Sequence, residues 1–251
     1  MKWLLLSLLS TFLIGCGPDL DDPKELDTII EEAMDVSKIQ ERGEGDQALI
    51  YAPNKQQPYT GWLKEISDSG QVRNLAQIKD GKQNGLDAKW SNNGQKVSEK
   101  EYKDGELHGD TTGWHENGQK SFEAEYKDGE LHGDTTGWHE NGQKSFESEY
   151  KDGELHGDTT GWHENGQKSF ESEYKDGELH GDTTGWHENG QKSFEAEWKN
   201  GKLVTVKVWL PDGSDCPDTN VQDGTGTVVL YDKDGKESSR DEWKNGIKVS
   251  E

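Results

Sequence analysis

Residues 101–123 read EYKDGELHGDTTGWHENGQKSFE, and the same letters return without change from Glu125, Glu149 and Glu173. The period is 24 residues, and the four central copies occupy residues 101–195. A fixed period of this length is typical of arrays in which each repeat is one small structural unit that packs on its neighbours. The copies therefore decide the fold, and the flanking sequence has to be interpreted around them.

Tryptophan and glycine mark the period through the array. The spaced residues are Trp90, Trp114, Trp138, Trp162 and Trp186, with Gly94, Gly118, Gly142, Gly166 and Gly190 four positions later. Degenerate copies on both flanks keep the glycine, so eight turn glycines are expected, and Gly70, Gly213 and Gly235 complete the set. We predict about eight repeats over residues 47–250, with atypical terminal copies acting as caps.

Each copy is expected to form two strands joined by a tight loop, residues 110–115 and 119–127. Phe122, Ala124 and Tyr126 alternate onto one face of the second strand, and the Asp-Gly pair that follows breaks it. The chain then continues into the next copy. The structural positions of one copy are Trp114, Gly118, Phe122, Tyr126, Gly129 and Gly133.

The length of the loop decides which side chains share a face. A two-residue turn would point Trp114 away from Phe122, whereas a three-residue loop over residues 116–118, with Gly118 left-handed, places both rings together. We predict the three-residue loop, because it gathers the aromatic rings on one side and leaves the intervening serine and glutamates in water.

The composition excludes an ordinary globular core. Of 251 residues, 28% are hydrophobic and 31% are charged, yet the chain has 10 Trp, 7 Tyr and 5 Phe. These aromatic residues argue against disorder, and the scarcity of aliphatic residues argues against a thick core. One copy buries too little surface to offset the entropy of ordering its own chain, so the copies must stack. We predict an all-β, elongated antiparallel hairpin-repeat solenoid or twisted single sheet, about 75–80 Å long.

The net charge of −23 excludes an ordinary nucleic-acid binder, because no basic face is available for phosphate. The acidic residues are best interpreted as a solvated surface that keeps the rod soluble. Stacked carboxylates could instead bind Ca²⁺ or Mg²⁺ weakly and bridge the rod to an anionic cell-surface polymer, although no dedicated metal site is predicted.

Catalytic signatures are missing from the sequence. No nucleophile motif, acid–base pair, phosphate loop or cofactor motif occurs, so we predict a non-enzymatic protein without a cofactor. The eight histidines recur as two rows, beginning with His108 and His115. They are expected to be exposed turn residues, and a transition-metal ladder would require the two rows to meet.

The N-terminus resembles a bacterial lipoprotein signal peptide over residues 1–15. Lys2 precedes an apolar stretch at residues 3–14 that is too short to span a bilayer, and residues 13–16 read LIGC, which resembles a lipobox. The resemblance implies that Cys16 becomes the acylated first residue of the mature chain. Gly17 follows, so we expect a bacterial outer-membrane or cell-surface location in the cell envelope. A plain signal peptide or an anchor helix is the alternative.

Residues 16–46 are predicted to form an acidic tether with a short amphipathic helix. Asp22 is a good N-cap, and the helix is expected to continue through Ile39 and to end by Gly43. It could pack on the end of the repeat stack. Cys216, in a turn-like segment, either has no role or forms an intermolecular disulfide or reactive thiol.

The pattern G-x-x-x-x-W-x-x-N-G-Q-K…E-x-x-Y-K-D-G-x-x-x-G resembles the bacterial variant of the MORN (membrane occupation and recognition nexus) repeat, which is often labelled as the YwqK family of toxin–antitoxin antitoxins. In one copy Trp114, residues 117–120, residues 126–129 and Gly133 carry this resemblance. It covers roughly residues 47–250. It implies hairpin repeats in an extended antiparallel sheet and, from eukaryotic MORN repeats, a link to membrane association and scaffolding.

These observations predict a lipid-anchored, extracytoplasmic repeat protein that acts as a spacer, a scaffold or a protein-interaction surface. The membrane would be contacted through lipidated Cys16, and the partner would be an unknown protein or a cell-surface polymer. One alternative is an antitoxin or immunity-type protein that binds a toxic partner. The other is a cell-surface glycan-binding module that stacks sugars on its Trp and Tyr columns.

Overall fold

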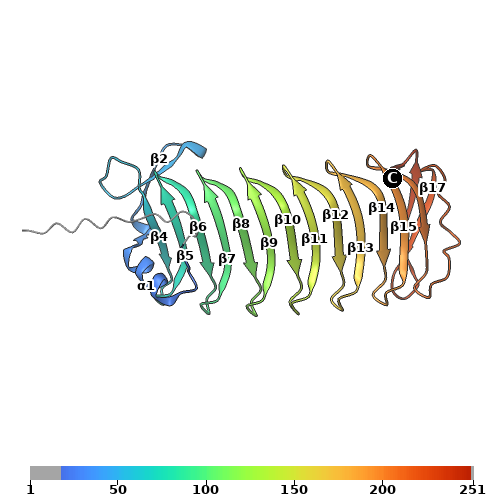
Figure 1. Ribbon diagram of the computed structural model, residues 1–251, viewed down its shortest axis with the longest axis horizontal. Coiled ribbons are helices and arrows are strands. Elements are labelled where there is room, and N and C mark those ends of the chain that lie inside the picture. The colour runs from blue at the N-terminus through green and yellow to red at the C-terminus, as the bar shows by residue number, and fades with distance from the viewer. Residues whose placement is uncertain (1–17, 250–251) are drawn as a thin grey trace, which may run out of the picture.

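The computed structural model describes residues 18–249 and is dominated by one long sheet of 14 strands (Figure 1). The strands follow one another along the long axis in chain order, from β4 (Gly61–Ile66) to β16 (Lys202–Val208), and short β1 (Met34–Asp35) pairs in parallel with β4. Between them lie β5 (Val72–Lys79), β6 (Lys82–Trp90), β7 (Lys96–Lys103), β8 (Glu106–Trp114), β9 (Lys120–Lys127), β10 (Glu130–Trp138), β11 (Lys144–Lys151), β12 (Glu154–Trp162), β13 (Lys168–Lys175), β14 (Glu178–Trp186) and β15 (Lys192–Lys199). The predicted all-β hairpin array is confirmed.

The predicted three-residue loop is present in every repeat. All eight turn glycines are left-handed, with φ between +75° and +84°. In the first perfect copy the Gly118 N–H donates to the His115 carbonyl at 2.9 Å, and the His115 N–H donates to the Gln119 carbonyl at 2.8 Å. The same two bonds recur at the other seven glycines. A residue with a Cβ atom would be strained at this position, which explains why even the degenerate copies keep glycine.

The Asp-Gly pair was predicted to break the strand between copies. In the structure it forms a second hairpin turn. Asp128 and Gly129 both have positive φ, +49° and +85°, which is the type I′ turn that matches the twist of the flanking strands. The tight turn lets pairing resume at once, so β10 begins at Glu130 and includes Gly133. Each central copy therefore has an eight-residue and a nine-residue strand, and the latter is longer than predicted.

The prediction that Trp114 shares a face with Phe122 and Tyr126 is wrong. Gly113 pairs with Phe122 but Trp114 pairs with Lys120, so Ser121 is an extra residue in β9. Paired residues of an antiparallel sheet point to the same face and consecutive residues point to opposite faces, so Gly113 lies beside Phe122 and Trp114 lies on the other side. The loop length was correct, and the additional β-bulge reversed its consequence.

The two faces of the sheet therefore carry different side chains. We call the side of Phe122, Ala124 and Tyr126, with their equivalents in the other copies, the aromatic face. We call the side of Asp110, Thr112, Trp114, Glu123 and Glu125, with their equivalents, the acidic face. Thr111 pairs with Ala124 and therefore lies on the aromatic face. Thr112 pairs with Glu123 and therefore lies on the acidic face.

Glycine and phenylalanine pack together on the aromatic face. Gly137 pairs with Phe122 on one side and with Phe146 on the other, and the two rings are 6.4 Å apart between centroids. A Cβ atom on Gly137 would overlap the Phe146 ring, so the ring occupies the space above the glycine. The neighbouring Thr135 is only 2% exposed, although a single sheet has no second layer to cover it. The aromatic rings and the adjacent strands supply this burial.

A helix covers the first end of the sheet. Helix α1 (Pro23–Glu32) is capped by the Asp22 carboxylate, as predicted, and buries Ile29 in a cluster with Leu75 and Ala88 on β5 and β6. The helix was predicted to continue through Ile39, but it stops at Glu32, seven residues earlier. The chain instead forms β1, a 3-10 turn η1 (Val36–Lys38) and β2 (Gln40–Arg42), followed by η2 (Gly45–Gln47) and β3 (Leu49–Tyr51), which pairs with β2.

The last repeat leaves the long sheet and forms a cap. Strands β17 (Gly226–Tyr231), β18 (Glu237–Lys244) and β19 (Ile247–Lys248) make a separate three-stranded sheet at the other end of the molecule (Figure 1). The core between this sheet and β16 contains Leu203, Val208, Val228 and Val229. The continuous sheet is thus about 60 Å long at the usual strand spacing, shorter than predicted for eight stacked repeats.

We predict that Gly161→Ala destabilises the array by about 1–3 kcal/mol, because the added methyl would overlap the Phe170 ring. Unfolding in urea measures the effect. Thr160→Ala, one position away on the acidic face, is the matched control and should cost less. Equal losses in the two variants would show that the ring does not depend on the missing Cβ atom.

Candidate functional site

The acidic face presents rows of carboxylates along the array. Asp110 pairs with Glu125, and Thr112 pairs with Glu123, so three carboxylates per copy lie close together. Together with Asp134 of the next copy they border a shallow groove of about 330 Å³. Equivalent grooves recur further along, of about 350 Å³ beside residues 134–160 and about 400 Å³ beside residues 182–207.

One carboxylate of each groove is paired and the others are not. The Lys120 ammonium bonds to Glu123, and the same pair recurs in the next three copies. Within residues 18–249, Asp110 and Glu125 have no such ion pair. Partial burial raises the pKa of Glu101, and the nearby Asp110 carboxylate raises it further. The face is therefore an anionic surface whose charge is only partly compensated by lysines, and it repels anions and attracts cations over several ångströms.

A dedicated metal centre is not formed by this surface. Across the part of the chain that the structure describes, no group of three or more His, Cys, Asp or Glu side chains is arranged to hold a metal ion. The carboxylates of one groove project in parallel from neighbouring strands, and they do not converge. The sequence left weak binding of divalent cations open. The acidic face provides rows of carboxylates for such binding, but among the described residues no carboxylates are grouped to coordinate one ion together.

The tryptophan row is half-buried on the acidic face. The Lys96 ammonium lies 5.5 Å from the Trp114 ring centroid and also bonds to Glu99 at 2.9 Å and to Asp21 at 2.7 Å. Trp90, the equivalent residue one copy earlier, packs instead against the cluster under α1. The Trp114 ring thus supports the Lys96 ammonium, and only part of each ring in the row reaches solvent.

The two histidine rows lie at opposite edges of the sheet. His108 and its equivalents are next to the Asp-Gly turns, where the His108 Nδ1 atom is 3.3 Å from the Asp128 carboxylate. His115 directly precedes the three-residue loop at the other edge of the sheet. It is seven residues from His108, or about 23 Å along an extended strand. Because the rows do not meet, they cannot form the transition-metal ladder that the sequence left open.

Polar contacts between successive copies repeat with the same geometry. The Asn117 side-chain amide donates to the Glu140 carbonyl of the next copy at 2.6 Å, and the His115 Nε2 atom lies 2.8 Å from the Trp138 carbonyl. At the opposite edge the Gly129 N–H donates to the Leu107 carbonyl at 2.8 Å. All three contacts recur through the central copies. Sequence reasoning assigned the asparagine to a turn and missed that it also joins neighbouring loops.

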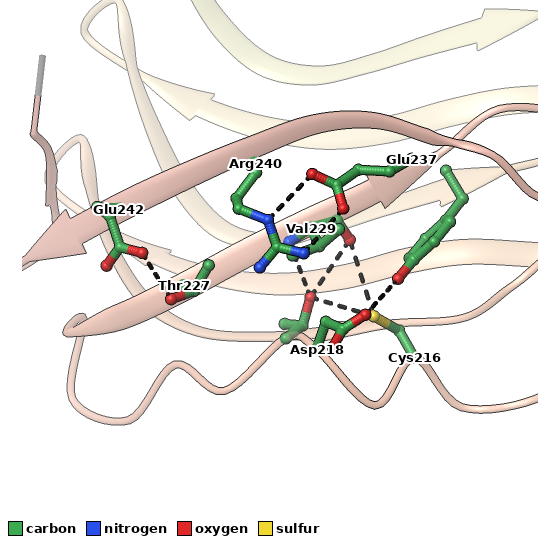
Figure 2. Close-up of polar contacts among 9 residues, drawn as sticks. Cys216, Asp218, Thr227, Val229, Glu237, Arg240 and Glu242 are labelled. Atoms are coloured by element: carbon green, nitrogen blue, oxygen red, sulfur yellow. Dashed lines mark hydrogen bonds and ion pairs between the residues drawn. The ribbon is translucent and has the colours of Figure 1, made fainter. Parts of the chain in front are cut away.

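The C-terminal cap carries a polar cluster that the repeats lack (Figure 2). The Tyr231 hydroxyl donates to the Asp218 carboxylate at 2.8 Å, and this bond is the main reason why the pKa of Tyr231 is raised. Arg240 donates two hydrogen bonds to Glu237, at 3.0 and 2.8 Å, and they lower the pKa of that carboxyl. These residues occur in none of the perfect copies, so the cap surface is unique within the array.

Cys216 lies beneath this cluster as a buried free thiol (Figure 2). Its sulfur is 3.6 Å from the Thr219 hydroxyl and 4.0 Å from the Val229 carbonyl, and it belongs to the core of the cap. A thiol in this position packs as a small apolar side chain. The alternative of an intermolecular disulfide would require the cap to open.

A buried carboxyl, Asp87, lies on the aromatic face of β6 where the perfect copies have threonine. Its two oxygens accept bonds from the Asn74 amide at 3.1 Å and from the Gln83 amide at 2.6 Å. Burial raises the pKa of Asp87, and the positive charges of Lys89 and Lys100 partly oppose this shift. Asn74 and Gln83 replace apolar residues of the repeat, a coordinated change that sequence analysis overlooked.

The residues that the sequence analysis singled out as structural positions of the repeat form turns and pack between strands in the structure. The tryptophans, the turn glycines and the Phe and Tyr positions all recur at equivalent places in the array. Cys16 lies outside the described residues, as does the predicted signal peptide, residues 1–15. Among residues 18–249, no helix is both long enough and apolar enough to cross a membrane.

Comparison with known proteins supports the repeat assignment. The family model of the MORN repeat variant matches residues 107–128, 131–152, 155–176 and 179–200. Each match begins at the Leu of the Leu-His-Gly triplet and ends at or next to the following Asp-Gly or Asn-Gly turn. No curated protein matches the chain.

We predict that Asp87→Asn reduces the pH dependence of stability. Because the folded pKa is raised, the wild-type carboxyl contributes stability below its unfolded pKa of about 3.9 and loses it as pH rises through the folded pKa. The variant should therefore gain stability relative to the wild type between pH 3 and pH 7.

Urea unfolding at several pH values measures this difference. Exposed Asp68, substituted by Asn, is the control and should leave the pH profile of the wild type unchanged. A wild-type minus Asp87→Asn difference that stays constant with pH would contradict the buried-carboxyl interpretation.

Proposed function

We propose that this protein is a lipid-anchored spacer whose identical copies set the distance between the membrane and its C-terminal cap. MORN-type repeats point to a scaffold or binding role, and the grooves along the acidic face are shallow and open to solvent. A rod of about 60 Å with two different ends is suited to holding one end away from the other.

The recurrence of one inter-copy contact set is the observation that carries the proposal. The Asn117-to-Glu140 bond has equivalents of 2.6 and 2.7 Å in the next two copies. When every junction is the same, a copy can be added or removed without creating a new type of interface. Length then becomes the property that the number of copies controls, and no single copy provides a unique recognition surface.

The anchor assignment rests on the LIGC sequence that ends at Cys16. Multiple acylation of this cysteine would hold the chain on a membrane stably, which one short acyl chain alone does not achieve. The acidic residues are compatible with an anchored rod, because an anionic membrane repels them and so disfavours a rod lying flat on the surface.

The partner is proposed to contact the C-terminal cap. Its cluster of Asp218, Tyr231, Glu237 and Arg240 is found once in the chain and lies at the end of the rod opposite the tether (Figure 1; Figure 2). A protein or a cell-surface polymer is the proposed ligand class. A small toxic protein captured by the cap would favour the immunity-type alternative, and a glycan captured by the chain would favour the alternative of a cell-surface glycan-binding module.

We predict that deletion of residues 125–148 leaves a folded protein whose sheet is shorter by two strands, or about 10 Å. The deletion removes one period and joins two identical junctions. Small-angle scattering measures the maximum dimension, and circular dichroism measures the fold. Spacer function should be largely retained, with partner binding unchanged.

Deletion of residues 125–136 is the matched control, because half a period removes one strand and reverses the direction of the chain at the junction. This variant should lose cooperative unfolding. A full-period deletion that abolishes partner binding while preserving the fold would overturn the spacer assignment and favour recognition by the central copies.

We predict that Cys16→Ser abolishes lipid attachment and releases the protein from the membrane fraction. Metabolic labelling with palmitate, followed by fractionation of the cell envelope, measures both effects. Cys216→Ser is the control and should keep the label, since that thiol is buried in the cap. Persistent labelling of the Cys16→Ser variant would contradict the lipobox assignment.

A further inference from the structure

We propose that two copies of this chain associate by exchanging repeats, with a register that is free to slip by whole periods. The partner is a second molecule of the same protein, and the surface is the strand–strand junction inside the array. This inference concerns the described residues 18–249 and does not depend on the anchor or on the spacer role.

The ends of the sheet are closed to such association. At the last strand, β16, the Val208 carbonyl accepts from the Cys216 N–H at 2.9 Å, and the Val204 carbonyl accepts from the Gly224 N–H at 2.8 Å. At the first end, β1 pairs with Leu63 and Lys64 of β4, and the Lys64 ammonium donates to the Ile30 carbonyl of α1 at 2.6 Å. Edge-to-edge pairing of two complete rods is therefore blocked by the caps.

The interior junctions are interchangeable. Glu123 of β9 pairs with Thr136 of β10, and the equivalent pairs further along are Glu147 with Thr160 and Glu171 with Thr184. The strands on both sides of these three junctions have the same sequence except at one position, which is Ala124 in β9, Ser148 in β11 and Ser172 in β13. A β9 strand from one molecule can thus pair with β10, β12 or β14 of another and form the same contacts.

The alanine-to-serine difference does not restore a unique register. Thr135 lies between Ala124 on one side and Ser148 on the other, so the same threonine position already accepts both neighbours. Thr159 likewise lies between Ser148 and Ser172. In most sheets a buried face fixes the register because slipped residues no longer match, but slippage by 24 residues restores every match here.

The turn between β9 and β10 is the hinge of the exchange. Opening the Asp128-Gly129 turn separates the N-terminal portion of the array from the C-terminal portion, and each portion then pairs with its counterpart from the second molecule. All strand contacts are recovered except the two hairpin turns, which is the usual low-cost route to an exchanged dimer. A slip of one period produces one rod with an extra copy and one rod with a copy fewer.

Disulfide trapping between chains tests the proposal in a full-length background carrying Cys16→Ser and Cys216→Ser. One population carries Glu123→Cys and the other carries Thr136→Cys for the native register or Thr160→Cys for the slipped register. In one folded molecule, Glu123 and Thr160 are three strands apart, about 14 Å, which is beyond disulfide reach. The two populations are unfolded together in urea, refolded together and then oxidised.

We expect covalent dimers from both pairings, with the slipped pairing within about threefold of the native one. Ala88→Cys is the matched control partner for Glu123→Cys, because it occupies the equivalent position in a diverged copy packed under α1 and should form few dimers. Mixing after separate folding should also give few. Light scattering coupled to gel filtration should show dimers from the parent chain after concentrated refolding.

If the Glu123→Cys and Thr160→Cys pair gives no more covalent dimer than the Ala88→Cys control, the register is not free to slip. If neither the native nor the slipped pairing gives covalent dimers, the two chains do not exchange repeats. Each single-cysteine variant is first checked for the circular dichroism and thermal unfolding of its parent. These outcomes are independent of the repeat-deletion result, since a rod can shorten without exchanging and can exchange without acting as a spacer.

Discussion

The structure depends on the packing of each repeat against the next, because the central repeats have no second layer to bury their side chains. A phenylalanine ring fills the space above a glycine of the neighbouring strand, as Phe146 does over Gly137. Removing water from this contact and completing the hydrogen bonds between strands both require the neighbouring copy to be present. The array is therefore cooperative along its length, and its ends need separate solutions.

The two ends of the sheet are covered by different elements, and each element packs on a different face. At the first end, helix α1 places Ile29 over Leu75 and Ala88, which are apolar residues at positions of the acidic face. At the last end, β17 to β19 and the preceding loop cover the aromatic-face residues Val206 and Val208 of β16. Each cap thus covers the opposite face from the other. The polar residues that characterise the perfect copies are replaced by apolar ones where a cap packs on them.

Identity among the central copies has opposite effects on recognition and on length. The three acidic grooves have similar linings of carboxylate and threonine side chains, so none of them gives a ligand a surface that marks one position along the rod. The same equality gives the junctions between central copies equivalent strand pairings, and both the proposed spacer role and the proposed exchange of repeats rest on this equivalence. The diverged C-terminal cap differs from these copies, because it contains a tyrosine–aspartate bond and an arginine–glutamate pair that none of the perfect copies has.

The sequence by itself determined the hairpins, the period and the turn glycines, because these are local properties. A left-handed residue at Gly118 requires only the backbone of its own loop, and the N-cap of Asp22 requires only the first turn of its helix. Such features are encoded within a few residues, so the eight turn positions could be identified in degenerate copies as well as in perfect ones.

Only the tertiary structure decided which face each tryptophan occupies, where α1 ends and how the last repeat leaves the sheet. The bulge at Ser121 depends on pairing with the neighbouring strand, and one extra residue there moves Trp114 to the opposite face from Phe122. The buried Asp87 is likewise satisfied by Asn74 on the adjacent strand and Gln83 four residues away, partners that no local pattern identifies. These outcomes were set by contacts between strands, and alternation along a single strand does not contain them.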